Sequence, residues 1–203
     1  MSTPTTPAKA PANKFSTDLA LVLPHLQLDA NGKAKLAGCK HPAEALDRLE
    51  EAGLLDEAAR LVAHALPPRE AVWWACTCSR HTAASGANPE AETALRAAAE
   101  EWVRRQTDEL RRAAMTEAEK TGFNSPEAWA AVAAFWSGDS MAPLEAPKVP
   151  PQPHFPGLAA AGSVALAAVR GQPVRREARL KQFLASARDI AAGGAGRLEP
   201  EAD

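Results

Sequence analysis

The stretch that decides the fold class is residues 55–81, LDEAARLVAHALPPREAVWWACTCSRH. Pro67 and Pro68 divide it, because proline has no amide hydrogen and its ring clashes with the preceding helical turn. A second helix is expected from about Arg69 to His81. Helices joined by so short a connection pack as antiparallel neighbours. In the first half, apolar residues recur at helical spacing, at Leu55, Ala58, Ala59, Val62 and Leu66.

Residues 15–41 give a weaker signal and are interpreted as an N-terminal arm. Leu19, Leu21 and Leu23 alternate with other residues, which favours a short strand or an extended segment. Residues 1–14 are rich in Ser, Thr, Pro, Ala and Lys. They hold too little apolar surface to offset the entropy of ordering, so we expect a disordered tail.

The remainder of the chain predicts an all-α protein with a single helical domain over residues 42–192. We expect about six or seven helices, arranged as short antiparallel pairs. A proline-rich belt at residues 142–156 interrupts them, because six prolines exclude helix or inner strand. Residues 193–203 are expected to form a flexible tail. One further helix is expected to begin near Pro42. The others are expected from Pro89 to about Lys120, from Ser125 to Trp136, from Leu158 to Val169 and from Leu180 to Ile190.

Composition and charge exclude several classes of protein. The chain has 203 residues and a formal net charge of −2, whereas dedicated nucleic-acid binders are usually strongly basic on one face. The longest apolar run, residues 155–169, contains Pro156 and Gly157 and is too short to span a bilayer. Three cysteines without a framework spacing fit a reducing compartment. The sequence therefore predicts a cytoplasmic protein with no membrane insertion.

A metal or catalytic centre around Cys76, Cys78 and His81 is the main alternative. On a helix, the two cysteines lie about 200° apart and cannot share one ion, although Cys78 and His81 could. A zinc site needs a second pair of ligands, and the spacing of the chain does not match a standard finger. A cysteine nucleophile would need a positioned imidazole and an orienting group, which the spacing does not select. The remaining candidate ligands are Cys39, His41, His25, His64 and His154.

Tryptophans and prolines offer a more informative pattern. Trp73 and Trp74 project about 100° apart on a helix, so one can face the core and the other a neighbouring helix or a groove. Trp136 stands at the end of its helix, just before the belt. Because proline packs well on indole rings, we expect the belt to cross the helices and cover their tryptophans. Alternatively, the segments at 147–150 or 150–153 dock into an aromatic groove of a partner.

Four basic residues form a local patch near the C-terminal helix. They are opposed only by Glu177 in the sequence. A solvated helix face is the simplest interpretation, an acidic protein partner the next, and RNA or a membrane surface follows. The patch consists of Arg175, Arg176, Arg179 and Lys181.

Two motifs carry a resemblance to a family of uncharacterised bacterial proteins. They are residues 66–76, LPPREAVWWAC, and residues 135–143, FWSGDSMAP. The resemblance extends from roughly Pro42 to Ile190. Some members accompany type VI secretion clusters, which implies an accessory or adaptor role beside a secretion machine. The motifs mark the family and are not catalytic motifs, so the resemblance implies no active site.

We therefore expect a non-enzymatic protein-interaction module, an adaptor or chaperone-like factor of a bacterial secretion or other multiprotein system. No cofactor and no metal are expected, and the partner is a protein. The alternatives are a small enzyme or metal protein centred on Cys76, Cys78 and His81, and a nucleic-acid accessory factor that uses the basic patch. Partner contacts are expected at Trp73, Trp74, Trp136, Asp139, Ser140, Met141, Arg175, Arg176, Arg179 and Lys181.

Overall fold

The computed structural model describes residues 13–201, and this range is helical without any strand. The all-α prediction is therefore confirmed, but the expected six or seven helices are too few, because the described residues form ten α-helices. Their bounds are α1 Leu19–Val22, α2 Ala30–Lys35, α3 Pro42–Glu51, α4 Leu55–Ala65, α5 Pro68–His81, α6 Pro89–Arg105, α7 Asp108–Lys120, α8 Pro126–Trp136, α9 Phe155–Val169 and α10 Arg176–Ala191.

The N-terminal arm contains two of the additional helices, so the strand expected at Leu19–Leu23 is wrong. Leu19 and Val22 are both buried, which is the i, i+3 spacing of a helix. The Asp18 carboxylate caps α1 by accepting from the Ala20 amide at 2.9 Å. Asp29 caps α2 in the same way. Short capped helices thus replace the extended arm.

The long polar helix expected over residues 89–120 is also divided. Gln106 adopts a left-handed backbone conformation, with φ 50° and ψ 37°, and ends α6. Thr107 then caps α7 through its side chain, which accepts from the Leu110 amide. The chain turns at this point, so α6 and α7 pack against each other and against α8.

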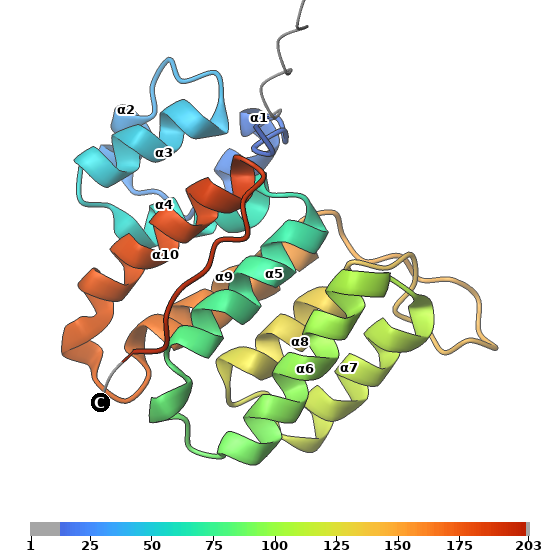
Figure 1. Ribbon diagram of the computed structural model, residues 1–203. Helices are drawn as coiled ribbons and strands as arrows, with labels where there is room; N and C mark the ends of the chain where they lie inside the picture. The colour runs from blue at the N-terminus through green and yellow to red at the C-terminus, as the bar shows by residue number, and fades with distance from the viewer. Residues whose placement is uncertain (1–12, 202–203) are drawn as a thin grey trace, which may run out of the picture.

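Helix α9 is the centre of the molecule. It contacts α4, α5, α8 and α10 (Figure 1). Its buried face is built from small residues, among them Ala159, Ala160 and Ala167, which let neighbouring backbones approach closely. The Ser163 hydroxyl donates to the Pro126 carbonyl at 2.7 Å and joins α9 to α8. The predicted buried central helix is therefore present.

The helices lie on two sides of the α5–α9 pair. Helices α6, α7 and α8 pack on one side, and α4 and α10 pack on the other, with α3 against α4 (Figure 1).

Within the described residues, no helix has both the length and the hydropathy needed to cross a membrane.

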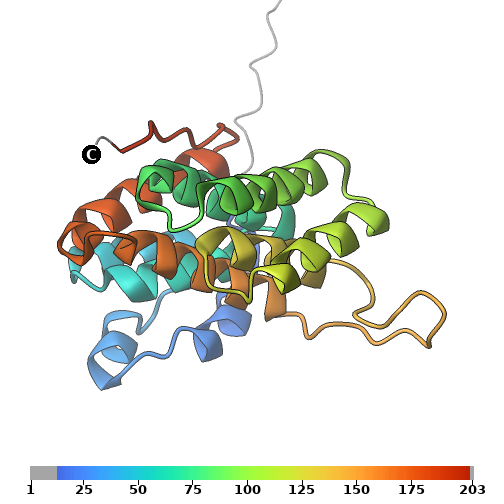
Figure 2. The ribbon, with the colours of Figure 1, turned by 90° about the horizontal axis from the view of Figure 1, so that it is seen from below.

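Residues 143–150 of the proline-rich belt do not cover the tryptophans, so the intramolecular interpretation is wrong for this part; only Phe155, near the end of the expected belt, packs against Trp136. Residues 143–150 are exposed and project away from the helices as a loop (Figure 2). Instead, the ends of the loop are held to each other and to α7, as described below. We refer to residues 142–153 as the proline-rich loop.

The C-terminal segment, residues 193–201, differs from the expected flexible tail. It runs back along α5 and α10 (Figure 1), and contacts between the segment and these helices hold it there. We call residues 193–201 the C-terminal strap. Of the expected disordered tail, residues 1–12 lie outside the described residues. The Lys14 amide bonds to the Ala191 carbonyl at 2.8 Å.

Candidate functional site

The two tryptophans of α5 have different environments. Trp74 is fully buried, and its indole N–H donates to the Phe183 carbonyl at 2.8 Å. Trp73 is partly buried and donates to the Ala195 carbonyl of the strap at 2.8 Å. The Arg80 guanidinium lies over the Trp73 ring. Trp74 therefore has no surface to offer a partner, whereas Trp73 faces a groove.

Trp136 and the turn that follows it lie at the base of the proline-rich loop. The Trp136 ring packs against Phe155, with 5.0 Å between the ring centroids. Asp139 is exposed and pairs with Lys148 of the loop, which lowers the pKa of that carboxyl. Met141 is partly buried. The predicted contact residues of this turn therefore lie beside the loop.

Ser140 is buried and ties the two ends of the loop together. Its hydroxyl oxygen accepts from the amides of Ala142 and Val149, both at 3.1 Å. The Met141 amide donates to the Val149 carbonyl at 2.7 Å. Arg112 of α7 donates to the Ala142 carbonyl at 2.8 Å. The loop is thus closed at its base and anchored on α7.

The predicted basic patch is divided among internal carboxylates. Arg176 pairs with Asp56 of α4, and Lys181 pairs with Glu177 at 2.7 Å. Arg179 is only 1% exposed and donates to the Ala168 and Arg170 carbonyls and to Glu201. Arg175 lies 3.5 Å from Glu201. The patch is therefore not a set of unpaired charges.

Cys76 and Cys78 are both fully buried in the core. Burial raises the pKa of each thiol far above its ordinary value, so neither is a thiolate near neutral pH. The His81 Nδ1 atom bonds to the Glu199 carbonyl. Cys39 is partly exposed and precedes α3. Among residues 13–201, no group of three or more His, Cys, Asp or Glu side chains is placed to hold a metal ion.

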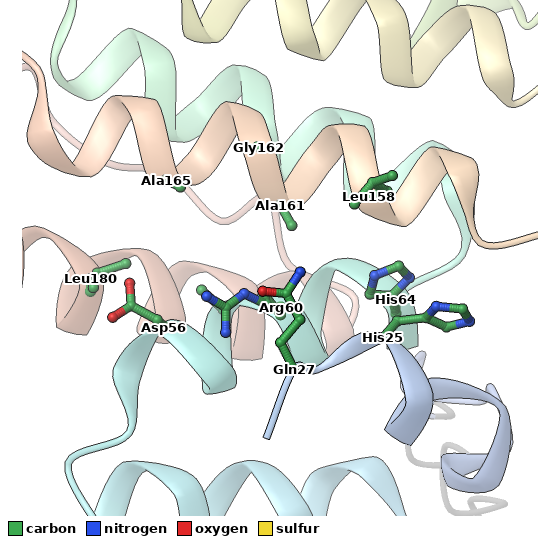
Figure 3. A pocket seen from close by; sticks show the side chains of 11 residues that line it. His25, Gln27, Asp56, Arg60, His64, Leu158, Ala161, Gly162, Ala165 and Leu180 are labelled. Carbon is green, nitrogen blue, oxygen red and sulfur yellow. The ribbon is translucent and has the colours of Figure 1, made fainter. Parts of the chain in front are cut away.

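A groove lined by histidines was not predicted as a site from the sequence. His25 follows α1 and His64 lies on α4, with 5.1 Å between their ring centroids (Figure 3). His154, at the start of α9, stacks on His25 at 4.3 Å. The groove has a volume of about 200 Å³, and α9 forms its other wall. The three histidines are far apart in the sequence, and only the packing of α4 and α9 brings them together.

The chemistry of this groove depends on His64 and His25, whose pKa values are both lowered by burial. Burial, followed by the neighbouring rings of His25 and His154, lowers the pKa of His64 to about 4. The rings stack face to face, so their nitrogens do not converge on one point. Arg60 also lines the groove, but it donates to the Leu26 carbonyl at 3.1 Å. This arrangement offers neither a convergent metal site nor a nucleophile–base pair.

The fold and its sites define an all-α domain with an exposed, closed proline-rich loop. The chain belongs to a family of unknown function, DUF6931, whose model matches residues 45–191. The matched region contains most of α3, all of α4 to α9 and α10, and the proline-rich loop, and it ends before the C-terminal strap. Comparison with curated proteins and with solved structures gives no match.

Proposed function

We propose that the protein is a non-enzymatic protein-interaction module that presents the proline-rich loop to a protein partner. The observation that carries this proposal is the exposure of apolar side chains on a loop with a fixed base. Leu144 is 72% exposed and Val149 is 50% exposed. Because both side chains lie on the same short loop, one partner surface could cover them together.

The closed base makes the loop ready for binding. Hydrogen bonds to the Ser140 hydroxyl and the Arg112 anchor fix where the loop leaves and rejoins the helices. The prolines at 147, 150, 151 and 153 further restrict the backbone. The loop therefore loses little conformational entropy when a partner binds it, which favours affinity.

The partner we expect has an aromatic groove that accepts an extended proline-rich segment. Such grooves bind proline rings and the apolar residues between them. Lys148 lies beside Val149 and pairs with Asp139, so an acidic residue at the rim of the groove would compete for it. A bacterial secretion system, such as type VI, is the first setting in which to search, because the motifs at 66–76 and 135–143 resemble proteins that accompany such clusters.

Site-specific photocrosslinking in the native host tests this proposal. A benzophenone amino acid is placed at position 144 or 149 in the loop, and at position 174 as the control. Val174 is 89% exposed but lies in the turn before α10, away from the loop. We expect one protein to crosslink from both loop positions and not from position 174. The same products from all three positions, or none from the loop, would contradict the proposal.

The partner identified by crosslinking is then purified, and its binding to variants of this protein shows whether the loop forms the interface or has only a structural role. We expect Leu144→Asp to weaken the complex by about thirtyfold or more, as for a residue at the centre of an interface. The melting temperature should not change, because the side chain is exposed in the free protein. Val174→Asp is the matched control and should bind normally. Equal binding by the two variants would refute the loop as the contact surface.

A further inference from the structure

The C-terminal strap lies on a groove whose contacts could recognise other extended peptides. Trp73 of α5 donates to the Ala195 carbonyl at 2.8 Å, and the Ser186 hydroxyl of α10 donates to the Gly196 carbonyl at 2.6 Å. Both contacts are made to the main chain of the strap. They therefore do not depend on its side chains at these two positions.

The far end of the strap is also held through its main chain. The Glu201 amide donates to the His81 carbonyl at 2.7 Å, and the His81 imidazole bonds to the Glu199 carbonyl. His81 thus contacts the strap with both its backbone and its ring. Together with Trp73 and Ser186, it forms a series of fixed partners for an extended backbone.

Two strap residues are selected by shape. Gly196 is buried with φ +62°, and a Cβ atom at this position would collide with Ile190 and Ser186 of α10. Only glycine fits both the backbone conformation and the space. Leu198, two residues later, packs against the core. By contrast, Arg197 between them is exposed.

A third strap residue is selected by charge. The Glu201 carboxylate accepts from Arg179 at 2.6 Å and lies 3.5 Å from Arg175. Hydrogen bonds from Arg179 lower the pKa of Glu201, so the carboxylate stays ionised in mild acid. The selected positions therefore follow the pattern Gly-x-Leu-x-x-Glu. The residues between them, Arg197, Glu199 and Pro200, are exposed.

The strap does not fill its groove. Hollows of about 360 and 400 Å³ flank it, and Trp73 and Arg104 line both of them. The groove residues Trp73, His81, Arg179 and Ser186 lie within the region matched by the family, whereas the strap itself lies outside that region. The groove is therefore part of the region that the family model matches, and the segment that covers it in this chain is not.

We propose that the groove between α5 and α10 is a peptide-binding site, and that the strap is its intramolecular competitor. The occupant that replaces the strap is an extended segment of a protein partner with a glycine, an apolar residue two positions later and a carboxylate five positions later. This surface is separate from the proline-rich loop, and the proposal holds whether or not the loop binds a partner.

A labelled peptide tests the competition in the full-length chain. The probe is a fluorescent peptide with the sequence of residues 193–201, GGAGRLEPE, and the readout is anisotropy. Gly196→Val in the protein releases the strap, because the added side chain meets Ile190, but leaves the groove residues unchanged. A tethered segment competes at an effective concentration on the order of millimolar. We therefore expect the variant to bind the peptide at least about tenfold more tightly than the wild type.

Glu201→Gln in the full-length chain is a second release variant, since it removes only the charge that Arg179 and Arg175 hold. Circular dichroism checks that both variants fold. Slower hydrogen exchange at the Glu201 amide in the wild type than in Gly196→Val reports that the strap is bound in the former. If neither variant binds the peptide more tightly than the wild type, the proposal is wrong.

Altered peptides test the pattern itself with Gly196→Val as receptor. A peptide with Leu198→Ala or Glu201→Gln should bind at least about tenfold more weakly, whereas one with Arg197→Ala and Glu199→Ala should bind normally. Equal binding of all four peptides would overturn the recognition pattern. A wild-type chain that dimerises by exchanging its straps would overturn the choice of a different protein as the partner.

Discussion

At the scale of single residues, the two adjacent tryptophans show what a sequence can and cannot predict. Their separation on a helix allows one to face the core and the other a neighbouring helix or a groove, and α5 buries Trp74 while Trp73 stays partly exposed. Which one is buried depends on α10, because the Phe183 carbonyl accepts the Trp74 N–H. The strap then accepts the Trp73 N–H. Neither acceptor could be identified from residues 66–76.

Replacement of the buried indole should be costly. We expect Trp74→Ala to lower the free energy of unfolding by about 3–5 kcal/mol, because it leaves a large cavity and an unpaired carbonyl. Trp136→Ala should cost less, because Trp136 is only partly buried against Phe155. Urea denaturation of both variants measures the difference. Equal losses would show that Trp136 contributes as much to the core as Trp74.

The stacked histidines should make stability depend on pH. In the unfolded chain a histidine takes up a proton as the pH falls below about 6.5, but folded His64 does so only near pH 4. The unfolded state thus binds more protons in this window, so stability falls between pH 6.5 and 4. We expect His64→Gln to reduce this dependence in urea titrations at about pH 7 and pH 5. The same change at His41, which is exposed, is the control and should leave it intact.

At the scale of elements, sequence signals located most helices but not their breaks. Ser125 and Pro126 predict the start of α8, and the Ser125 hydroxyl indeed accepts from the Ala128 amide at 3.2 Å. The break between α6 and α7 has a weaker signal, because Thr107 is an N-cap residue but the preceding Gln106 is a residue type that rarely adopts a left-handed conformation. Tertiary packing of α7 on α8 imposes this turn.

The left-handed backbone of Gln106 predicts that a substitution by glycine changes the free energy of unfolding in opposite directions at two positions of α6 and its C-terminus. Gln106→Gly should raise the free energy of unfolding by up to about 1 kcal/mol, because glycine tolerates a positive φ. Ala97→Gly, at an exposed position inside α6, should lower it by about 1 kcal/mol. Thermal and urea denaturation provide the measurement. A loss in both variants would mean that Gln106 is not strained.

The candidate sites were predicted only in part at this scale. The turn at Asp139–Met141 was identified from its motif, and it does lie at the base of the exposed loop. The histidine groove and the strap groove were missed, because each forms from helices that are distant in the sequence. Periodicity within one helix cannot show which other helix will face it.

At the scale of the whole molecule, buried charges join α6 and α8 to the central α5–α9 pair. Glu127 of α8 is fully buried and accepts from Arg170, at the end of α9, at 3.0 Å. Arg96 of α6 approaches the same carboxylate at 3.4 Å. Arg170 also donates to the Thr82 carbonyl after α5. This network fixes four helix segments around one carboxylate, and no local pattern in the sequence predicts it.

Removal of one member of this network should be severe. We expect Glu127→Gln to cost about 3–5 kcal/mol, because it removes the charge of the carboxylate nearest to the buried Arg170 guanidinium and leaves only Glu92, at 3.9 Å. The double variant Glu127→Leu with Arg170→Leu removes both charges. Its loss of unfolding free energy should therefore be smaller than the sum of the losses in the single variants Glu127→Leu and Arg170→Leu. Glu177→Gln, at an exposed pair, should change stability by less than about 0.5 kcal/mol. An additive double variant would show that the pair is not coupled.

The placement of the three thiols allows the opening of the core around α5 to be followed by cysteine alkylation. Cys39 is partly exposed, whereas Cys76 and Cys78 lie inside α5 with no access to solvent. An alkylating reagent should therefore add one mass increment to the native protein, and the second and third should arrive together when α5 is released. The interval between the first and the later increments, followed by intact-mass spectrometry, would give the rate at which the core opens without any engineered label.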